Sequence, residues 1–210
     1  MKLIIQIFVI FLLPSILFCQ NKNISTNKVN AESYAIFRRG ELKDKQGDKV
    51  GALKDYNKAI ALDPNFSYFD RRGFLKFLQK DYHGALIDYN KVIELNPYAE
   101  AYNIRGNIKC FLEDKQGAMK DYNKCIELDP ESGNAYHNRG LLKSDLGDYH
   151  GALTDYNKAI SFDPESSVSY LQRGKLKIEL NDITGACNDF SKAGELGAFE
   201  AYDLIKIHCN

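Results

Sequence analysis

The sequence predicts an all-α protein: an α/α superhelix (solenoid) of about five helix pairs, followed by a C-terminal capping helix. The first observation is a stretch that reads GALTDYNKAISFDP from Gly151 and occurs five times with small changes. The second is its spacing, because the alanines of the repeated Gly-Ala pair lie 33, 33, 34 and 34 residues apart: Ala52, Ala85, Ala118, Ala152 and Ala186. One such unit cannot bury its hydrophobic face alone, so a regular period indicates stacked repeats.

The first helix of each repeat is predicted around a second recurrent glycine. It runs from about eight residues before that glycine to about six residues after it, as from Gly133 to Leu146 around Gly140. A turn follows, and an aspartate stands at the same place after each one: Asp48, Asp81, Asp114, Asp148 and Asp182. This carboxylate is expected to accept hydrogen bonds from the free N–H groups that open the second helix.

The second helix of each repeat carries an alanine, an aromatic residue four positions later and a small residue three positions further. In the fourth repeat these are Ala152, Tyr156 and Ala159, which the helical period places on one face. Asp-Pro or Asn-Pro then ends the helix, because proline cannot continue it. Four repeats end in this way, and Ala198 stands where a fifth proline is expected.

These recurrent positions resemble the tetratricopeptide repeat (TPR) family over about residues 33–200. The matching residues of the fourth repeat are Tyr136, Gly140, Gly147, Ala152, Tyr156, Ala159 and Pro164. The resemblance implies antiparallel helix pairs that stack into a right-handed superhelix with a concave binding surface. The predicted segments are a signal peptide (1–19), a flexible linker (20–32), five repeats (33–65, 66–98, 99–132, 133–166 and 167–200) and a capping helix (201–210).

The chain departs from the TPR pattern at several positions. An arginine precedes the first-helix glycine where the family often has leucine, and Lys80 and Glu113 replace the turn glycine in the second and third repeats. The fifth repeat is degenerate. The residues from Phe199 to His208 are expected to form a helix that covers its exposed face, as an open-ended array requires.

The N-terminus predicts export. A basic start, Met1-Lys2, precedes an apolar run from Leu3 to Phe18, which is typical of a secretory signal peptide and short for a membrane span. Cleavage is expected after Cys19, which leaves a polar tether, and the protein is then periplasmic or secreted. Two alternatives stay open, in which Cys19 is lipidated or the segment remains as an uncleaved anchor. The composition suggests a bacterial source.

The balance of charge argues against nucleic-acid binding. The 210 residues include 28 basic and 28 acidic side chains, so no basic excess is available to neutralise phosphates. No Ser–His–acid or HExxH arrangement, no glycine-rich phosphate loop and no zinc-knuckle spacing occurs. We therefore expect no enzyme activity, no cofactor, no metal and no small-molecule substrate.

A column of charged residues recurs with the repeats. Each first-helix glycine follows an arginine, a lysine stands four residues after that arginine, and an aspartate stands three residues after each Gly-Ala alanine; in the fourth repeat these are Arg139, Lys143 and Asp155. They form either a basic ladder for an acidic ligand or a repeated internal ion pair. We favour the ion pair, because each positive column has its own negative one and a guanidinium suits a partly buried carboxylate. The aspartate is expected on the second helix of the same repeat or of a neighbour.

The predicted binding groove consists of first-helix positions that do not recur. By resemblance to TPR grooves, the candidate partner-binding residues are Asp70, Phe74, Phe77, Asn103, Asn107, Phe111, His137 and Leu141. An apolar patch in a groove suits a helix or an extended peptide. The alternative is that the three phenylalanines pack between repeats. The lysines and asparagines with which some TPR domains clamp a chaperone's C-terminal carboxylate are not matched here.

Four cysteines follow the predicted signal peptide. Cys187 and Cys209 are a possible disulfide, because Cys187 faces the next unit and Cys209 falls on the helix expected to pack there. Cys110 and Cys125 lie at heights that differ by roughly 10 Å, too far for a bridge. Cys125 occupies the small core position and is expected to be a buried thiol.

The function predicted from the sequence is a non-catalytic scaffold that binds a protein or peptide in the concave groove. Two alternatives were weighed against it. One is an enzyme or regulatory subunit with a site around His137, Asn103 and Asn107, and the other is a nucleic-acid-binding helical repeat.

Overall fold

The computed structural model describes residues 28–209, and this part of the chain consists of helices joined by short turns, without a strand. The predicted all-α architecture of helix pairs is thereby confirmed. The described residues fall into two compact units, one up to Gln79 and one from Lys80 onward, and each is considered by itself. The predicted signal peptide (1–19) and the first part of the predicted linker (20–27) lie outside the described residues.

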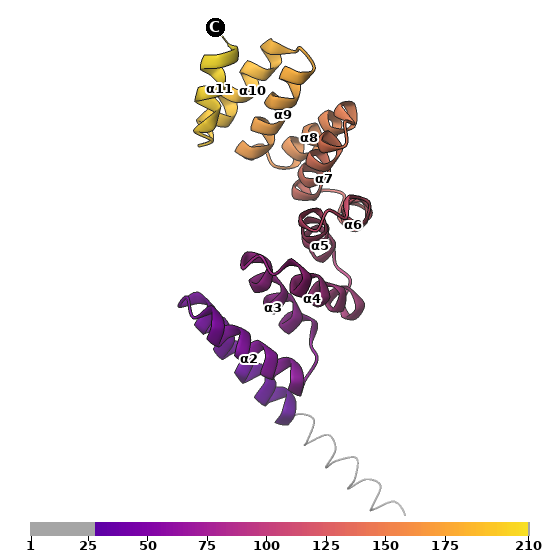
Figure 1. The fold of residues 1–210 in the computed structure, drawn as a ribbon, viewed down its shortest axis with the longest axis vertical. Coiled ribbons are helices and arrows are strands. Elements are labelled where there is room, and N and C mark those ends of the chain that lie inside the picture. The colour runs from indigo at the N-terminus through magenta and orange to yellow at the C-terminus, as the bar shows by residue number, and fades with distance from the viewer. Residues whose placement is uncertain (1–27, 210) are drawn as a thin grey trace, which may run out of the picture. The chain divides into compact units, whose positions relative to one another are not determined.

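The first unit contains a leading helix and two further helices. Residues 28–45 are helical, α2 spans Lys49–Leu62 and α3 spans Phe66–Leu78 (Figure 1). The aromatic rings of Phe37, Tyr56 and Tyr68 meet in its core, with the Phe37 centroid 4.5 Å from that of Tyr68. The predicted flexible linker was wrong for residues 28–32, which belong to the leading helix. No glycine or proline interrupts the chain between residue 28 and Gly40, so nothing stops the helix from extending backward.

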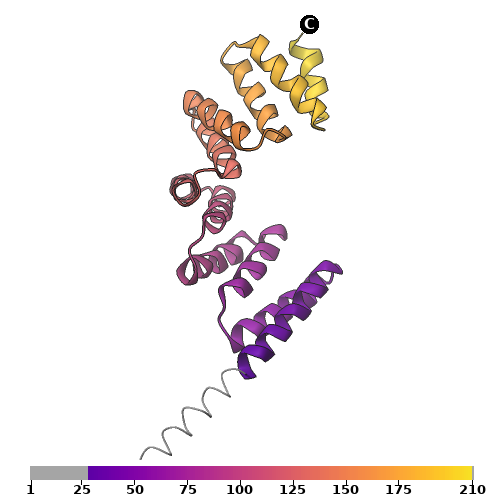
Figure 2. The same cartoon turned by 180° about the vertical axis from the view of Figure 1, so that it is seen from behind.

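The second unit contains eight helices in sequence (Figures 1 and 2). Each first helix contacts the second helix of its own repeat, and each second helix contacts the element that follows it. The helices are α4 (Tyr82–Leu95), α5 (Ala99–Phe111), α6 (Lys115–Leu128), α7 (Gly133–Asp145), α8 (Tyr149–Phe162), α9 (Ser167–Glu179), α10 (Ile183–Glu195) and α11 (Glu200–His208).

In four helix pairs, a first-helix glycine packs against an aromatic ring of the second helix: Gly40–Tyr56, Gly106–Tyr122, Gly140–Tyr156 and Gly174–Phe190. In the fourth repeat a Cβ atom on Gly140 would lie 2.9 Å from Cε1 of Tyr156, and in the third repeat a Cβ atom on Gly106 would lie 2.5 Å from Cε1 of Tyr122. Both rings are buried. The recurrent glycine is therefore required by close approach, because any side chain there would push the two helices apart.

The turns between paired helices use two recurrent features. The aspartate side chain caps the second helix as predicted, and Asp148 Oδ1 accepts a hydrogen bond of 2.9 Å from the N–H of Gly151. The residue before the cap turns the chain in a left-handed conformation, with φ of 82° at Gly147. Lys80 and Glu113 adopt φ of 63° and 61° at the same place, so these residues bear strain that glycine avoids.

The array ends in the predicted capping helix. α11 packs on α10, where Ala201 is buried beside Ala193 and Phe190. The ring of Tyr202 lies over Gly194, where a Cβ atom would meet it at 2.9 Å. Within residues 28–209, no helix is both long enough and apolar enough to cross a membrane.

Candidate functional site

The recurrent arginines pair with the recurrent aspartates inside the repeats, as predicted. In the fourth repeat Arg139 donates from Nε and Nη2 to the two carboxylate oxygens of Asp155, both at 2.8 Å, and Lys143 Nζ lies 2.8 Å from Asp155 Oδ2. The structure places the partners within one repeat. The equivalent pairs are Arg39–Asp55, Arg105–Asp121 and Arg173–Asp189.

These ion pairs shift the pKa values of the residues that form them. The hydrogen bonds from the Arg39 guanidinium hold the pKa of the Asp55 carboxyl well below its usual value, although burial acts in the opposite direction. The hydrogen bonds to Asp155 likewise raise the pKa of Arg139. With both charges held in their ionised forms, this column serves the fold and is not available to an acidic ligand.

From the second repeat onward, the recurrent arginine also reaches back to the preceding repeat, a contact that sequence reasoning missed. Arg139 Nη1 donates to the side-chain oxygen of Asn123 at 2.7 Å, and its guanidinium lies 5.4 Å from the centroid of the Tyr136 ring. The same hydrogen bond joins Arg72 to Asn57, Arg105 to Asn90 and Arg173 to Asn157. The available signal was the asparagine itself, which recurs two residues after the aspartate in four copies and is replaced by Ser191 in the last.

Successive first helices of the second unit contact one another, and hollows lie along them. α5 contacts α7, and α7 contacts α9. Two hollows adjoin along α7, and both are lined by Leu141 and Asp145. The first, of about 270 Å³, is completed by Cys110, Glu113, Lys115 and Leu142. The second, of about 330 Å³, is completed by Ser144, Tyr149, Tyr156, Gln172, Lys175, Leu176 and Glu179.

Leu141, a predicted groove residue, forms the shared wall of these hollows and is 37% exposed. Phe111, at the end of α5, is 58% exposed, and its ring is stacked on that of Tyr82 with centroids 4.6 Å apart. The exposed Phe111 ring, stacked on the partly buried Tyr82, offers an apolar surface at the end of α5.

The predicted amide residues of the groove are turned inward. Asn103 is only 3% exposed, and its side-chain oxygen accepts a hydrogen bond of 2.9 Å from Asn138 on α7. Asn107 accepts a hydrogen bond of 2.8 Å from the hydroxyl of Tyr122. The prediction that Asn103 faces the groove was therefore wrong, because its amide instead satisfies the polar contact between α5 and α7.

His137 belongs to α7, and its side chain contacts α9. Its Nδ1 atom is 2.9 Å from the hydroxyl of Ser169, and its ring centroid is 5.8 Å from that of Tyr156. Burial lowers the pKa of His137, because the charged ring is poorly solvated there. This contact joins two successive first helices, and the Ser169 hydroxyl that His137 contacts is buried at 1% exposure.

The other three predicted groove residues lie on α3 in the first unit. Phe74 is 40% exposed, whereas Asp70 and Phe77 are partly buried. Phe37 in the leading helix, by contrast, packs into the core of the first unit. Phe74 is thus an exposed apolar residue of the first unit.

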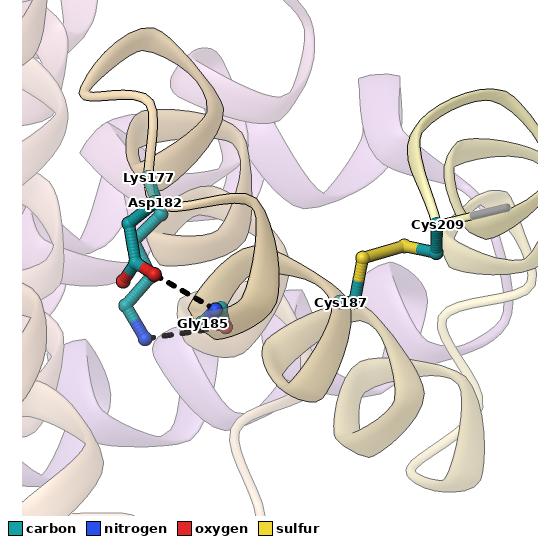
Figure 3. Close-up of a disulfide and its surroundings, with 5 residues drawn as sticks. All are labelled: Lys177, Asp182, Gly185, Cys187 and Cys209. Atoms are coloured by element: carbon teal, nitrogen blue, oxygen red, sulfur yellow. Dashed lines mark hydrogen bonds between the residues drawn. A yellow bond between two sulfur atoms is a disulfide. The ribbon is translucent and has the colours of Figure 1, made fainter.

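Cys187 and Cys209 form a disulfide in the structure, which agrees with the pairing expected from the sequence (Figure 3). Their sulfur atoms are 2.04 Å apart, and the bridge links α10 to the residue that follows α11.

Cys110 and Cys125 remain free thiols, and Cys125 is buried as predicted. Burial raises the pKa of both thiols, which disfavours the reactive thiolate. Among residues 28–209 there is no group of three or more metal-ligating side chains.

Family models of the tetratricopeptide repeat match three segments of the chain, residues 33–66, 99–132 and 133–166. No curated protein matches the sequence significantly.

Several solved structures share the fold. The crystal structure of MamA is 27% identical, covers 78% of this chain and 96% of its own, and has a TM-score of 0.69. A MamA structure from Desulfovibrio magneticus RS-1, 19% identical over 78% of this chain and 94% of its own, has a TM-score of 0.71. YrrB, described as a TPR protein with an unusual peptide-binding site, is 18% identical over 89% of this chain and 97% of its own, with a TM-score of 0.67. At these lower identities the likeness concerns the fold alone.

Proposed function

The chain belongs to the tetratricopeptide repeat family, and from that premise we propose that it is a non-catalytic scaffold of the cell envelope. It binds a protein or peptide segment in the groove of α5, α7 and α9. Repeats of this family support a role in protein–protein interaction. The finer part of the proposal, the groove and the compartment, has its own supporting observations.

One observation carries the groove assignment. The recurrent polar residues of the repeats are engaged in internal contacts, whereas the non-recurrent Leu141 stands partly exposed where two hollows adjoin. An exposed apolar residue in a hollow gains free energy when a partner covers it, by about 25 cal/mol for each Å² of apolar surface removed from water. The site is therefore built for contact with another apolar surface.

The polar candidates of the groove do not favour catalysis. Asn103, Asn107 and His137 hydrogen-bond to Asn138, Tyr122 and Ser169, and these bonds join helices of the fold. His137 and the Ser169 hydroxyl are within hydrogen-bond reach, but Ser169 is only 1% exposed and also contacts Ser166, so its hydroxyl does not face a groove ligand as a nucleophile would.

Envelope localisation is supported by two features. The apolar run from Leu3 to Phe18 after a basic start is typical of an export signal. A disulfide between Cys187 and Cys209 suits an oxidising compartment. Fractionation of the source cells, with determination of the mature N-terminus, tests this part. A chain retained in the cytoplasm with Met1 intact would contradict it.

Site-specific photo-crosslinking tests the groove. A photoreactive residue at position 141 is expected to capture a protein partner in the native envelope, whereas the same residue at position 87, where Ile87 is 64% exposed on α4, is not. Leu141→Asp should abolish co-purification of that partner without changing the thermal unfolding midpoint, and Ile87→Asp should leave it unchanged. Equal capture from both positions would contradict the proposal.

A further inference from the structure

The groove of α5, α7 and α9 has an apolar floor. Leu141 is partly exposed along the shared wall of the two hollows, with Leu142 and Cys110 beneath one of them and Leu176 beneath the other. This surface suits an apolar side chain of a partner. The chemistry of the flanking residues depends on the charges at the rim.

Three successive first helices end at the rim of this groove, and each brings a carboxylate there. α7 ends at Asp145 and α9 at Glu179, while Glu113 follows the end of α5 in the turn. The carbonyl end of a helix carries a partial negative charge, which adds to that of the carboxylates.

The cations that usually balance a helix C-terminus are engaged elsewhere in these helices. Lys109, Lys143 and Lys177 lie in the last turns of α5, α7 and α9, but their ammonium groups point to the internal aspartates at 2.8 Å. Because these lysines are paired with internal aspartates, they do not neutralise the negative helix ends at the rim.

The two ammonium groups that do line the groove are also paired. Lys115 Nζ lies 2.5 Å from Asp145 Oδ2, and Lys175 Nζ lies 2.7 Å from Glu200 Oε1. Among the described residues Glu113 and Glu179 take part in no ion pair. With the partner Glu200 counted, four carboxylates face two ammonium groups, so the groove keeps a charge of about −2.

The Lys115–Asp145 pair is open to exchange. Their side chains are 38% and 58% exposed, and an ion pair at such a surface contributes little, about 0–1 kcal/mol. A cation from a partner can therefore replace Lys115 on Asp145 at small cost. Asp145 lines both hollows, so a cation placed there is adjacent to Leu141 in either one.

We infer that the groove of α5, α7 and α9 takes a protein segment in which lysine or arginine residues flank an apolar side chain. The apolar side chain covers Leu141, and the cations face Glu113, Asp145 and Glu179. This inference rests on the proposed function and specifies the chemistry of the partner. It follows from charge complementarity between a negative rim and a basic segment.

Fluorescence anisotropy with three labelled peptides and the full chain tests it. The basic apolar peptide is GSKLKFKLSG, the charge-reversed one is GSELEFELSG and the basic polar one is GSKSKSKSSG. The first is expected to bind at least tenfold more tightly than either of the others at 50 mM salt, and to lose affinity as the salt rises.

Two matched sets of substitutions separate the rim from charge in general. The rim variant carries Glu113→Gln, Asp145→Asn and Glu179→Gln. The control carries Glu94→Gln, Glu127→Gln and Glu195→Gln, which remove the same charge from the second helices, where these residues are 62%, 66% and 62% exposed in pairs with lysines. We expect at least a tenfold loss of affinity for the basic apolar peptide in the rim variant and no change in the control.

A substitution with the opposite expected effect completes the design. Lys115→Gln frees Asp145 and should tighten binding of the basic apolar peptide several-fold, whereas Lys120→Gln, on the same helix but outside both hollows, should not. Equal losses in the rim and control variants, or tighter binding of the charge-reversed peptide, would overturn the inference.

The outcomes distinguish this inference from the proposed function. If the charge-reversed peptide binds and Leu141→Asp abolishes that binding, the groove function stands and the preference for a basic partner is wrong. If position 141 captures no partner and no peptide responds to Leu141→Asp, the groove function itself is wrong.

Discussion

At the scale of single residues, a few buried charges connect each repeat to itself and to its neighbour. Asp155 is 2% exposed at its side chain and holds both Arg139 and Lys143, while Arg139 also reaches Asn123 in the preceding repeat. Loss of the carboxylate leaves two cations without their counter-charge, whereas loss of the arginine leaves the carboxylate with its lysine. The two members of the pair are therefore not equivalent.

Asp155→Ala is expected to lower the free energy of unfolding by about 3–5 kcal/mol, because it breaks a buried ion pair from the carboxylate side. Arg139→Leu is expected to lower it by about 1.5–3 kcal/mol, because Lys143 still neutralises Asp155. Urea denaturation measures both. Glu127→Ala, in an exposed pair with Lys124, serves as control and should change stability by less than about 0.5 kcal/mol. An Asp155→Ala protein as stable as this control would contradict the assignment.

The left-handed turn residues give a second prediction at this scale. Lys80 has φ of 63° where the equivalent turn of the fourth repeat has Gly147. Lys80→Gly relieves this strain and is expected to raise the free energy of unfolding by about 0.5–1 kcal/mol, after the larger entropy of glycine in the unfolded chain is subtracted. Thermal denaturation is a suitable measurement. Gly147→Ala should have the opposite effect, and a stabilising Gly147→Ala would show that the turn is not strained.

At the scale of helices, polar side chains join successive first helices of the second unit. Asn103 receives a hydrogen bond from Asn138, and His137 shares one with Ser169. These contacts do not recur from repeat to repeat, so they differ in chemistry from the ion pairs of the recurrent column. The joint between α7 and α9 is the one that contains a titratable group.

Acidification is expected to weaken the joint at His137. Because burial lowers its folded-state pKa below the ordinary value of 6.5, the unfolded chain binds the proton first as the pH falls. The contribution of neutral His137 to the free energy of unfolding is therefore complete above about pH 6.5. Below that pH it declines, by at most about 1.4 kcal/mol per pH unit. Urea denaturation between pH 7.5 and 5 measures the slope. His137→Gln should reduce the pH dependence of the free energy of unfolding, whereas His150→Gln, at an exposed position, should leave it unchanged. An unchanged slope in the His137→Gln protein would refute the prediction.

The recurrent positions made the helices and the ion pairs predictable from the sequence. The capping Asp148 and the Arg139–Asp155 pair each fall at a fixed spacing, and the structure places them as expected. Whether a side chain points inward or toward the groove was harder to predict where the helical period is compatible with both. Asn103 was expected at the groove but lies inward, because a buried amide found a partner on the next helix.

The charged rim of the groove was not predicted as a site. Glu113, Asp145 and Glu179 lie at or just beyond the ends of helices, and the sequence does not show that three such ends meet at one surface. Their partners could not be deduced either, because Lys115 pairs with a residue of the following repeat. Stacking of first helices brings these residues together, and this is a property of the folded array.

At the scale of the whole molecule, the chain consists of repeats, and the stability of such a protein is approximately a sum of contacts between neighbouring elements. In its last described repeat, α11 packs on α10, and a disulfide from Cys187 to Cys209 links α10 to the residue that follows α11. A bridge across a separation of 22 residues restricts the unfolded chain and contributes about 3 kcal/mol.

Replacement of both cysteines by serine is therefore expected to loosen the end of the array before the rest. Amide hydrogen exchange should accelerate in α10 and α11 and remain unchanged in α5 and α6, because contacts in an array extend only to neighbours. Cys110→Ser, which removes a free thiol, provides the control. Uniform acceleration along the second unit would show that the array unfolds as one cooperative body.

The hydrogen bond from each arginine to the asparagine of the repeat before it also gives the chain a direction. Every copy of the DYN triplet offers an acceptor forward, and every copy of the Arg-Gly pair offers a donor backward. A block of one repeat carries one of each, so duplication or loss of a whole block leaves this donor and this acceptor matched at the new junction. Ser191, in the copy followed by the arginine-free α11, ends the series. In evolutionary terms, the length of this protein can change by whole repeats while this recurrent contact is kept, whereas the non-recurrent contacts between first helices differ at each new junction.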